Sequence, residues 1–501
     1  MIDGRSEVEN LIEEYSCLFD YSKKETAIIL AAGHGKRIKS NTSKMLHKIW
    51  QTPTVERVIN SCAKGFTDSN IIVVVGIKAQ DVIKTIGKGK SVIFAHQEVQ
   101  NGTGHAVQMG LEKIDFAKYD GTVYVFPGDM GLIDAETVTS FKNEFEKSGS
   151  DMMVLTGLYE GDVLDNHYGR IVRAKTKDSK GKSSAKISGN VLEIIEYKDI
   201  MNLGDKKPYK IKFDKKEFSY SQKELIENRE FNSGVFAFKF KPLFEEIKKI
   251  ENNNVQNEIY LTDMIYLFNK SGYKVSAVSP KEQHVVMGFN TKSVLLEMEK
   301  IAQKISYEKI KDIIIINDPN DFFIDESIID EILELDKQGL PLDIQIGKGV
   351  FIGKGVKMNY NLELGRNVKL VGNIQLGKNV RIGENSCISC FYGQTVCVGN
   401  NVNIHTFCTV KGNVFINDDC TIESNVRITG NDELHVKIGK KVTVKGVSYI
   451  FGSQIDENIF IEHSSIIKKH ISKPEGVKTE IYKVKYYFPE QEGAEAVKDL
   501  K

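Results

Sequence analysis

The sequence predicts an α/β domain with a mostly parallel sheet, followed by a parallel β-helix built from hexapeptide repeats. Two observations carry this prediction. Short runs rich in Val and Ile alternate with helical patterns through the first 290 residues, and from residue 343 an aliphatic residue recurs about every six positions. The length of 501 residues, too great for one hydrophobic core, also favours more than one domain.

Composition narrows the class of protein. The 68 basic residues balance 68 acidic ones, which argues against a nucleic-acid or anionic-membrane partner. No apolar run approaches the roughly 20 residues that span a bilayer, and the acidic start of the chain lacks the basic head and apolar middle of a secretory signal. Seven cysteines, an odd number, do not suggest a disulfide framework. We therefore expect a cytoplasmic protein.

The expected elements follow in order along the chain. Residues 1–24 form an extension with a short amphipathic helix, whose apolar face carries Val8, Leu11, Ile12 and Tyr15. Residues 25–290 form the α/β domain. Its predicted strands are Ala27–Ala32, Ile71–Val75, Val92–Ala95 and Val123–Phe126, with helices such as Val55–Lys64 and Ala106–Lys113 between them. Ligands of such sheets bind at the carboxyl ends of the strands.

The later segments differ in texture. Lysine-rich, weakly periodic sequence between about 174 and 230 predicts surface loops or hairpins inserted into the α/β domain. Residues 291–342 are expected to be a helical connector, since 291–312 contain no Gly or Pro. The hexapeptide repeats occupy 343–470, where Gly or Asn takes the tight corners, and 471–501 form a charged tail.

A candidate phosphate-binding turn follows the first predicted strand. The segment Leu30 to Lys44, LAAGHGKRIKSNTSK, contains Gly33 and Gly35 with Arg37 and Lys44 behind them. The spacing of a Walker loop and the third glycine of a dinucleotide fingerprint are both absent. A bare backbone turn with two cations can bind a phosphate, although a lone turn of this kind is more often a plain turn with surface cations.

The strand–LAAGxGxR…K arrangement closely resembles the start of the sugar nucleotidylyltransferases, in particular the bacterial N-acetylglucosamine-1-phosphate uridylyltransferases. The resemblance covers about residues 26–290 in six ordered motifs and implies a Rossmann-like nucleotidyltransferase domain. It implies that Arg37 and Lys44 are catalytic, although Ser43 stands where the family usually has Pro. Thr103 in the segment NGTGHAV and Gln97 just before it would face the base of the nucleotide. Gly102, also in this segment, would allow the base to approach the backbone closely. The nucleotide-binding residues are then Leu30, Ala32, Gly33, Gly35, Gln97, Gly102 and Thr103.

The same resemblance implies a metal site and a sugar site. Asp129 in FPGDMGLI and Asn290 in GFN would bind Mg²⁺, which prefers one or two carboxylates plus phosphate and water. Taken alone, Asp129 could equally cap a helix and Asn290 is more often a turn residue. Gly169 in YGR, Glu196 in IIEYKD and Asn232 in FNSG would bind the sugar.

The implied activity is uridylyl transfer from UTP to a sugar-1-phosphate, most simply N-acetylglucosamine-1-phosphate, giving UDP-N-acetylglucosamine and pyrophosphate with Mg²⁺ as cofactor. One alternative changes the substrates, for example to glucose-1-phosphate with UTP or dTTP. Another is a non-catalytic regulatory subunit with the same fold. The presence of Arg37, Lys44, Asp129 and Asn290 together argues against the regulatory subunit.

The resemblance implies that the hexapeptide repeats form a left-handed β-helix. The bifunctional relatives acetylate glucosamine-1-phosphate on such a β-helix with a histidine base, and the second domain departs from them in this respect. None of the histidines here has such surroundings, so acetyltransferase activity is not expected; they are His405, His435, His463 and His470. Cys387 and Cys390 form a CxxC, but small residues stacking between coils explain it better than a metal. Because related β-helices commonly pack as trimers, the resemblance implies a homotrimer.

Overall fold

The computed structural model describes residues 6–33, 35–89, 91–204, 208–252, 254 and 256–489. The chain divides into two compact units, residues 1–299 and 300–501. Helix α10 (Lys292–Ile310) runs from the first into the second and matches the helix predicted for 291–312. No helix of the described residues is both long and apolar enough to cross a membrane.

The first unit is built on a sheet with the strand order β13-β7-β12-β6-β1-β4-β5. The predicted strands are confirmed as β1 (Glu25–Ala31), β4 (Ser69–Val75), β5 (Val92–His96) and β6 (Thr122–Pro127), all parallel. Beyond β6 the sheet is mixed. Its strands there are β12 (Glu230–Lys239), β7 (Met152–Leu158) and β13 (Val275–Val278), while β8 (Arg170–Arg173) and β9 (Val191–Ile195) extend from β12.

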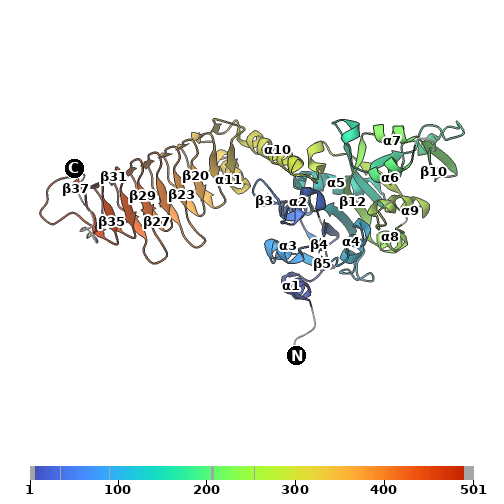
Figure 1. The fold of residues 1–501 in the computed structure, drawn as a ribbon, viewed down its shortest axis with the longest axis horizontal. Helices are drawn as coiled ribbons and strands as arrows, with labels where there is room; N and C mark the ends of the chain where they lie inside the picture. The colour runs from blue at the N-terminus through green and yellow to red at the C-terminus, as the bar shows by residue number, and fades with distance from the viewer. Residues whose placement is uncertain are drawn as a thin grey trace, which may run out of the picture. The chain divides into compact units, whose positions relative to one another are not determined.

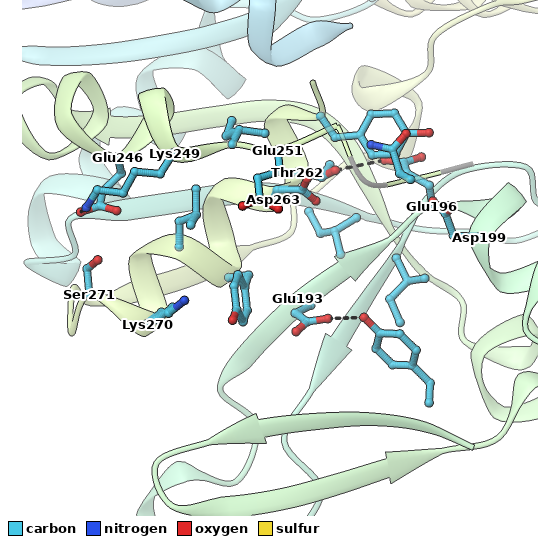
Figure 2. Close-up of a pocket in the computed structure, with 18 of the residues that line it drawn as sticks. Glu193, Glu196, Asp199, Glu246, Lys249, Glu251, Thr262, Asp263, Lys270 and Ser271 are labelled. Atoms are coloured by element: carbon cyan, nitrogen blue, oxygen red, sulfur yellow. Dashed lines mark hydrogen bonds and ion pairs between the residues drawn. The ribbon is translucent and has the colours of Figure 1, made fainter. Parts of the chain in front are cut away.

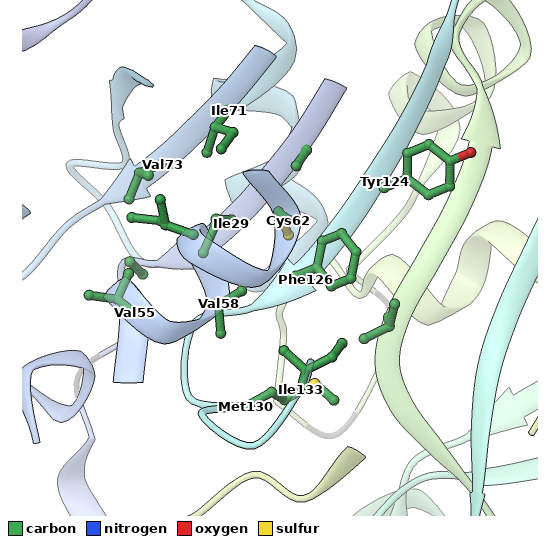
Figure 3. Packing of buried hydrophobic residues seen from close by; sticks show 14 of the residues in the cluster. Ile29, Val55, Val58, Cys62, Ile71, Val73, Tyr124, Phe126, Met130 and Ile133 are labelled. Atoms are coloured by element: carbon green, nitrogen blue, oxygen red, sulfur yellow. The ribbon is translucent and has the colours of Figure 1, made fainter. Parts of the chain in front are cut away.

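Helices cover both faces of this sheet because neighbouring residues of each strand point to opposite sides. Ala27 and Ile29 of β1 belong to one buried cluster, shown in Figure 3, and Ile28 belongs to the other. The first cluster includes residues of α2 (Thr54–Phe66), α3 (Ala79–Ile86) and α5 (Ala135–Ser148). The second includes residues of α4 (Thr103–Leu111), α8 (Phe240–Glu246) and α9 (Met264–Lys270). Each fully buried aliphatic side chain contributes about 1.5–3 kcal/mol.

The N-terminal extension covers the edge of the sheet at β5. Helix α1 (Glu7–Tyr15) begins at a capping box on Ser6, and its predicted apolar face packs against the first cluster. After the helix, the Cys17 N–H donates to Val92 O (2.8 Å) and Ser16 Oγ accepts from the Phe94 N–H (2.9 Å). Backbone groups of the edge strand that would otherwise be unpaired are thus satisfied within the chain.

The lysine-rich insertion folds into defined elements with a small core of its own. They are α6 (Tyr197–Asn202), the hairpin β10 (Tyr209–Phe213) and β11 (Lys216–Tyr220), and α7 (Gln222–Glu227). Asp214 and Lys215 both have positive φ, as a two-residue hairpin turn requires. Buried Phe218 and Ile211 pack against β8 and β9. Residues 205–207 of the insertion lie outside the described residues.

The second unit is the predicted left-handed parallel β-helix, with its strands in three parallel sheets over the described residues (Figure 1). The first sheet contains β14 (Ile315–Ile316), β16 (Ile344–Ile346), β19 (Leu362–Leu364), β22 (Val380–Ile382), β25 (Asn403–Ile404), β28 (Thr421–Ile422), β31 (Thr443–Lys445), β34 (Ile459–Glu462) and β37 (Tyr482–Lys485). The second contains β15 (Phe322–Ile324), β17 (Val350–Ile352), β20 (Lys369–Val371), β23 (Cys387–Ser389), β26 (Thr409–Lys411), β29 (Arg427–Thr429), β32 (Tyr449–Phe451) and β35 (Ser465–Ile467). The third contains β18 (Val356–Lys357), β21 (Ile374–Leu376), β24 (Val396–Val398), β27 (Val414–Ile416), β30 (Val436–Ile438), β33 (Gln454–Ile455) and β36 (His470–Ile471).

The β-helix extends beyond the repeats in both directions. Strands β14 and β15 lie within 291–342, where the sequence predicts a helical connector, and they pair with β16 and β17. Helix α11 (Glu326–Asp336) follows β15 and interrupts the six-residue period, which is why the repeat does not reveal this first coil. At the other end, β37 belongs to the predicted charged tail and pairs with β34 of the first sheet. Residues 490–501 of that tail lie outside the described residues.

Candidate active site

The predicted phosphate turn and Asp129 lie where the strand order reverses. Strand β1 lies between β4 and β6. Strands β4 and β5 lie on one side of β1, and β6, the next strand of this sheet along the chain, lies on its other side. A crevice at the carboxyl ends of the strands is expected at such a switch point. The Gly128 N–H, just before Asp129, donates to Leu30 O (3.0 Å) and ties the two sides of this crevice together.

Lys44 joins the two predicted metal ligands. It begins the short 3₁₀ helix η2 (Lys44–Leu46), and its ammonium forms an ion pair with the Asp129 carboxylate and donates to Asn290 Oδ1 (2.9 Å). The side chains of Lys44 and Asp129 are 10% and 15% exposed, so water screens this pair little. The ammonium also lies 5.3 Å from the centre of the Phe289 ring. Three segments far apart in sequence thus meet at one charged centre.

Gly35 is required by the position of Lys44. Its φ of +62° is in the left-handed region, and a Cβ there would lie 2.8 Å from Lys44 Cβ. Gly33 is exposed and Ala32 is buried, so the backbone of this turn is open on one side. Arg37 is exposed on η1 (Lys36–Ile38) and makes no ion pair with a described residue.

The predicted base-binding segment follows β5 and is packed against residues 259–261. Gln97 is buried and its Nε2 donates to Gly102 O (3.0 Å). Thr103 Oγ1 accepts from the Leu261 N–H (3.1 Å). Gly102 has a φ of +97°, and a Cβ there would lie 2.5 Å from Ile259 O. The absence of a side chain at Gly102 therefore also serves packing within the chain.

The base-binding segment and the phosphate turn are neighbours. Gly76, directly after β4, separates them: a Cβ at this position would lie 2.8 Å from both Ala32 O and Gln100 Nε2. Only a glycine fits between the two loops, which brings them together on one edge of the sheet.

The predicted sugar-binding residues are also brought together. Gly169 O accepts from the Asn232 N–H (2.8 Å), and a Cβ on Gly169 would lie 3.2 Å from Glu196 Oε1. Asn232 Oδ1 accepts from the Gly234 N–H (2.9 Å), which fixes the amide orientation. Burial, followed by the charge of Asp199, raises the pKa of Glu196 to about 7.

Glu196 lies on the wall of a cavity of about 920 Å³, shown in Figure 2. The cavity wall includes residues that the sequence analysis missed. Thr262 Oγ1 donates to Glu196 Oε1 (3.4 Å), and Tyr209 of the insertion donates to Glu193 Oε2 (2.7 Å). Burial raises the pKa of Asp263 to about 6. No recognisable motif of the sequence contains these positions, so the sequence did not predict them.

A magnesium ion would fit the pair Asp129 and Asn290. One carboxylate oxygen and one amide oxygen already face a common cation, the Lys44 ammonium. Mg²⁺ needs no larger protein ligand set when substrate phosphates and water complete its coordination. Among the described residues, no group of three or more His, Cys, Asp or Glu side chains could hold a metal ion.

The cysteines and histidines of the β-helix form no comparable centre in the part of the chain that is described. All seven cysteines are free. The His470 Nε2 lies 2.9 Å from Asp456 Oδ1 and the His405 Nε2 lies 3.2 Å from Asn403 Nδ2. His463 stacks on Tyr486 with ring centres 5.6 Å apart.

Comparisons with known proteins find similarity to nucleotidyltransferases in part of the chain. Residues 27–187 match the family of the MobA-like NTP transferase domain. The bifunctional protein GlmU of Caldicellulosiruptor saccharolyticus is 35% identical over 279 residues, 56% of this chain and 52% of the relative. The bifunctional protein GlmU of Clostridium tetani is 34% identical over 307 residues, 60% of this chain and 58% of the relative. The chain thus spans little more than half the length of these relatives.

A solved structure of UDP-glucose pyrophosphorylase with UDP-glucose is similar at 14% identity and a TM-score of 0.38. The match covers 57% of this chain and 100% of that one.

Proposed function

We propose that this chain, whose residues 27–187 form an NTP transferase domain related to the bifunctional proteins GlmU, transfers uridylyl from UTP to a sugar-1-phosphate. The sugar phosphate we propose is N-acetylglucosamine-1-phosphate, which gives UDP-N-acetylglucosamine and pyrophosphate. The observation that carries the proposal is the contact of Lys44 with both Asp129 and Asn290 at the switch point of the sheet.

The reaction needs no nucleophilic side chain, because the phosphate oxygen of the sugar-1-phosphate is already an anion. That oxygen attacks the α-phosphorus of UTP in line, the bond to the bridging oxygen breaks, and pyrophosphate leaves with the electron pair. The protein positions the two substrates and offsets their charge, with Lys44 and Arg37 on the triphosphate side. When bound at Asp129 and Asn290, Mg²⁺ would neutralise phosphate charge.

The sugar end of the site supports a polyhydroxylated substrate. Gly169, Glu196 and Asn232 offer a backbone carbonyl, a carboxylate and an amide within one cluster. Such groups bind hydroxyls and an N-acetyl group by hydrogen bonds. We therefore propose that this cluster selects the sugar.

The test is pyrophosphate release from the full chain with Mg²⁺, each nucleoside triphosphate and a panel of sugar-1-phosphates. We expect release with UTP and N-acetylglucosamine-1-phosphate, and a loss of about 10²-fold or more in Asp129→Ala. The matched control is Asp134→Ala, which removes a nearby carboxylate that caps α5 by accepting from the Thr137 N–H (2.7 Å). Full activity in a folded Asp129→Ala protein would contradict the metal site, and activity only with another sugar or base would replace the proposed substrates.

We also propose that the β-helix assembles the chain as a homotrimer and that the protein works in the cytoplasm. The resemblance to trimeric β-helices supports the first point, and the seven free cysteines support a reducing compartment. Sedimentation equilibrium of the full chain tests the trimer, which predicts three times the mass of 56.4 kDa.

A further inference from the structure

The loop that carries Gly169 is held by a buried cation. The side chain of Arg170 is fully buried, and no carboxylate of a described residue pairs with it. Its guanidinium donates instead to two backbone carbonyls of the loop, Tyr168 O and Asn166 O, the latter at 2.7 Å. The Tyr168 N–H donates to Asn166 Oδ1 (3.1 Å). These contacts fix the backbone of residues 166–169, which we call the sugar loop.

The Tyr168 side chain reaches from the sugar loop to the turn that carries Asn290. Its ring stacks on Phe231 with centres 4.5 Å apart and an interplanar angle of 28°. Its hydroxyl donates to Gly288 O (3.2 Å), which has no other donor among the described residues. A Cβ on Gly288 would lie 3.3 Å from Asp129 Oδ1, so this turn also packs directly against the Asp129 carboxylate.

We propose that Tyr168 is a positioning residue that couples the sugar loop to the turn of Asn290. The hydroxyl holds the Gly288 carbonyl, and through it the Asn290 amide, in place beside Asp129. An occupied sugar site would then strengthen divalent-cation binding. The inference rests on the proposed function, because it assigns the sugar loop and the Asn290 turn to two parts of one active site.

The coupling between the sugar site and the cation site is positive and reciprocal. If a bound sugar restrains the loop and the loop restrains Asn290, each ligand raises the affinity of the other by the same factor. Loss of one hydrogen bond of this kind weakens the coupling by about 3- to 10-fold. The stack on Phe231 does not depend on the hydroxyl, so the loop itself keeps its place when only the oxygen is removed.

The variant that removes only the hydroxyl is Tyr168→Phe in the full chain. Its matched control is Tyr220→Phe, which also removes a bond from a buried tyrosine to a backbone carbonyl, Arg173 O at 2.7 Å. The measurement is the affinity for UDP-N-acetylglucosamine, determined by calorimetry with and without Mn²⁺. UDP-N-acetylglucosamine does not react in this mixture, because pyrophosphate is absent. Mn²⁺ binding is followed separately by the electron paramagnetic resonance of the free ion.

We expect Mn²⁺ to raise the affinity of the unaltered chain and of Tyr220→Phe by the same factor, and that factor to fall about 3- to 10-fold in Tyr168→Phe. Saturating Mn²⁺ should restore most of the turnover of Tyr168→Phe. The coupling is overturned if Mn²⁺ raises the affinity of Tyr168→Phe and of the unaltered chain by the same factor. It is also overturned if the unaltered chain does not bind Mn²⁺ at all. Failure of the proposed function would look different: no pyrophosphate would be released with any substrate, while the factor by which Mn²⁺ raises the ligand affinity would still be smaller in Tyr168→Phe than in the unaltered chain.

Discussion

At the scale of single residues, the candidate site depends on close approaches that only glycine allows. Gly35 lies against the stem of Lys44, Gly76 lies between two loops, and Gly102 lies against Ile259. A side chain at any of these positions would move a neighbour by a few tenths of an ångström or more. Displacements of that size matter where substrates are positioned rather than chemically activated.

Gly35→Ala should therefore lower pyrophosphate release by about 10-fold or more while the domain remains folded. The reason is steric, since the new Cβ would displace Lys44 from Asp129 and Asn290. Gly149→Ala is the matched control, because Gly149 has a similar φ of +59° but nothing within 4 Å of an added Cβ. Both variants should lose about 1 kcal/mol of stability. Equal activities in the two variants would show that the contact with Lys44 does not matter.

The raised pKa of Glu196, about 7, predicts a pH-dependent affinity for the sugar. Below pH 7 the carboxyl is protonated and loses acceptor capacity, so KM for the sugar-1-phosphate should rise as pH falls from 8 to 6. At one pH unit below the pKa about a tenth of the carboxyl is ionised, which sets the rise at about 10-fold. Glu196→Gln should remove this dependence, and a KM for the unaltered chain as flat as that of the variant would contradict the assignment.

At the scale of elements, side-chain ladders reinforce the coils of the β-helix. Asn379 has a φ of +58° at a corner, where it accepts from Asn361 Nδ2 (2.8 Å) and donates to Asn401 Oδ1 (2.7 Å). Asparagine tolerates the left-handed region better than other side chains, and stacking adds the amide bonds. The repeat therefore uses Asn at this corner for two separate reasons.

Two substitutions separate these reasons. Asn379→Gly removes the ladder but keeps the backbone unstrained, whereas Asn379→Ala removes the ladder and adds the cost of positive φ, about 1 kcal/mol. We expect thermal unfolding, followed by circular dichroism, to show Ala as more destabilising than Gly, and both as less stable than Asn. Equal stability of all three proteins would mean that the ladder contributes nothing measurable.

At the scale of the whole molecule, the family match and the predicted site both lie in the first unit. The family model matches residues 27–187, and the predicted site residues all lie before residue 299, in that unit. In the second unit, His405 and His470 contact Asn403 and Asp456 rather than a shared centre. The chemistry that we propose therefore lies in the first unit.

Acetyl-CoA with glucosamine-1-phosphate should therefore yield no free thiol above background when added to the full chain. The measurement is the colour of a thiol reagent, with pyrophosphate release in the same preparation as the control for intact protein. Thiol release that depends on glucosamine-1-phosphate would show an acetyltransferase site that neither the repeats nor the histidine contacts reveal.

Local patterns predicted the architecture because periodicity is a local property. The runs of Val and Ile gave β1, β4, β5 and β6, and the six-residue period gave the β-helix, except where α11 interrupts the first coil. The sequence predicts loops or hairpins for the insertion but does not predict its small core around Phe218. That core forms from contacts between β8, β9 and the hairpin, and such contacts between separate segments produce no periodic pattern in the sequence.

The sequence alone predicts the fold class and the order of the motifs along the chain. The tertiary structure shows which of the motif residues come into contact. Lys44 contacts Asp129 and Asn290 across separations of 85 and 246 residues. Such contacts depend on the order of the strands in the sheet and on the loops at their carboxyl ends, and no local sequence pattern encodes that order.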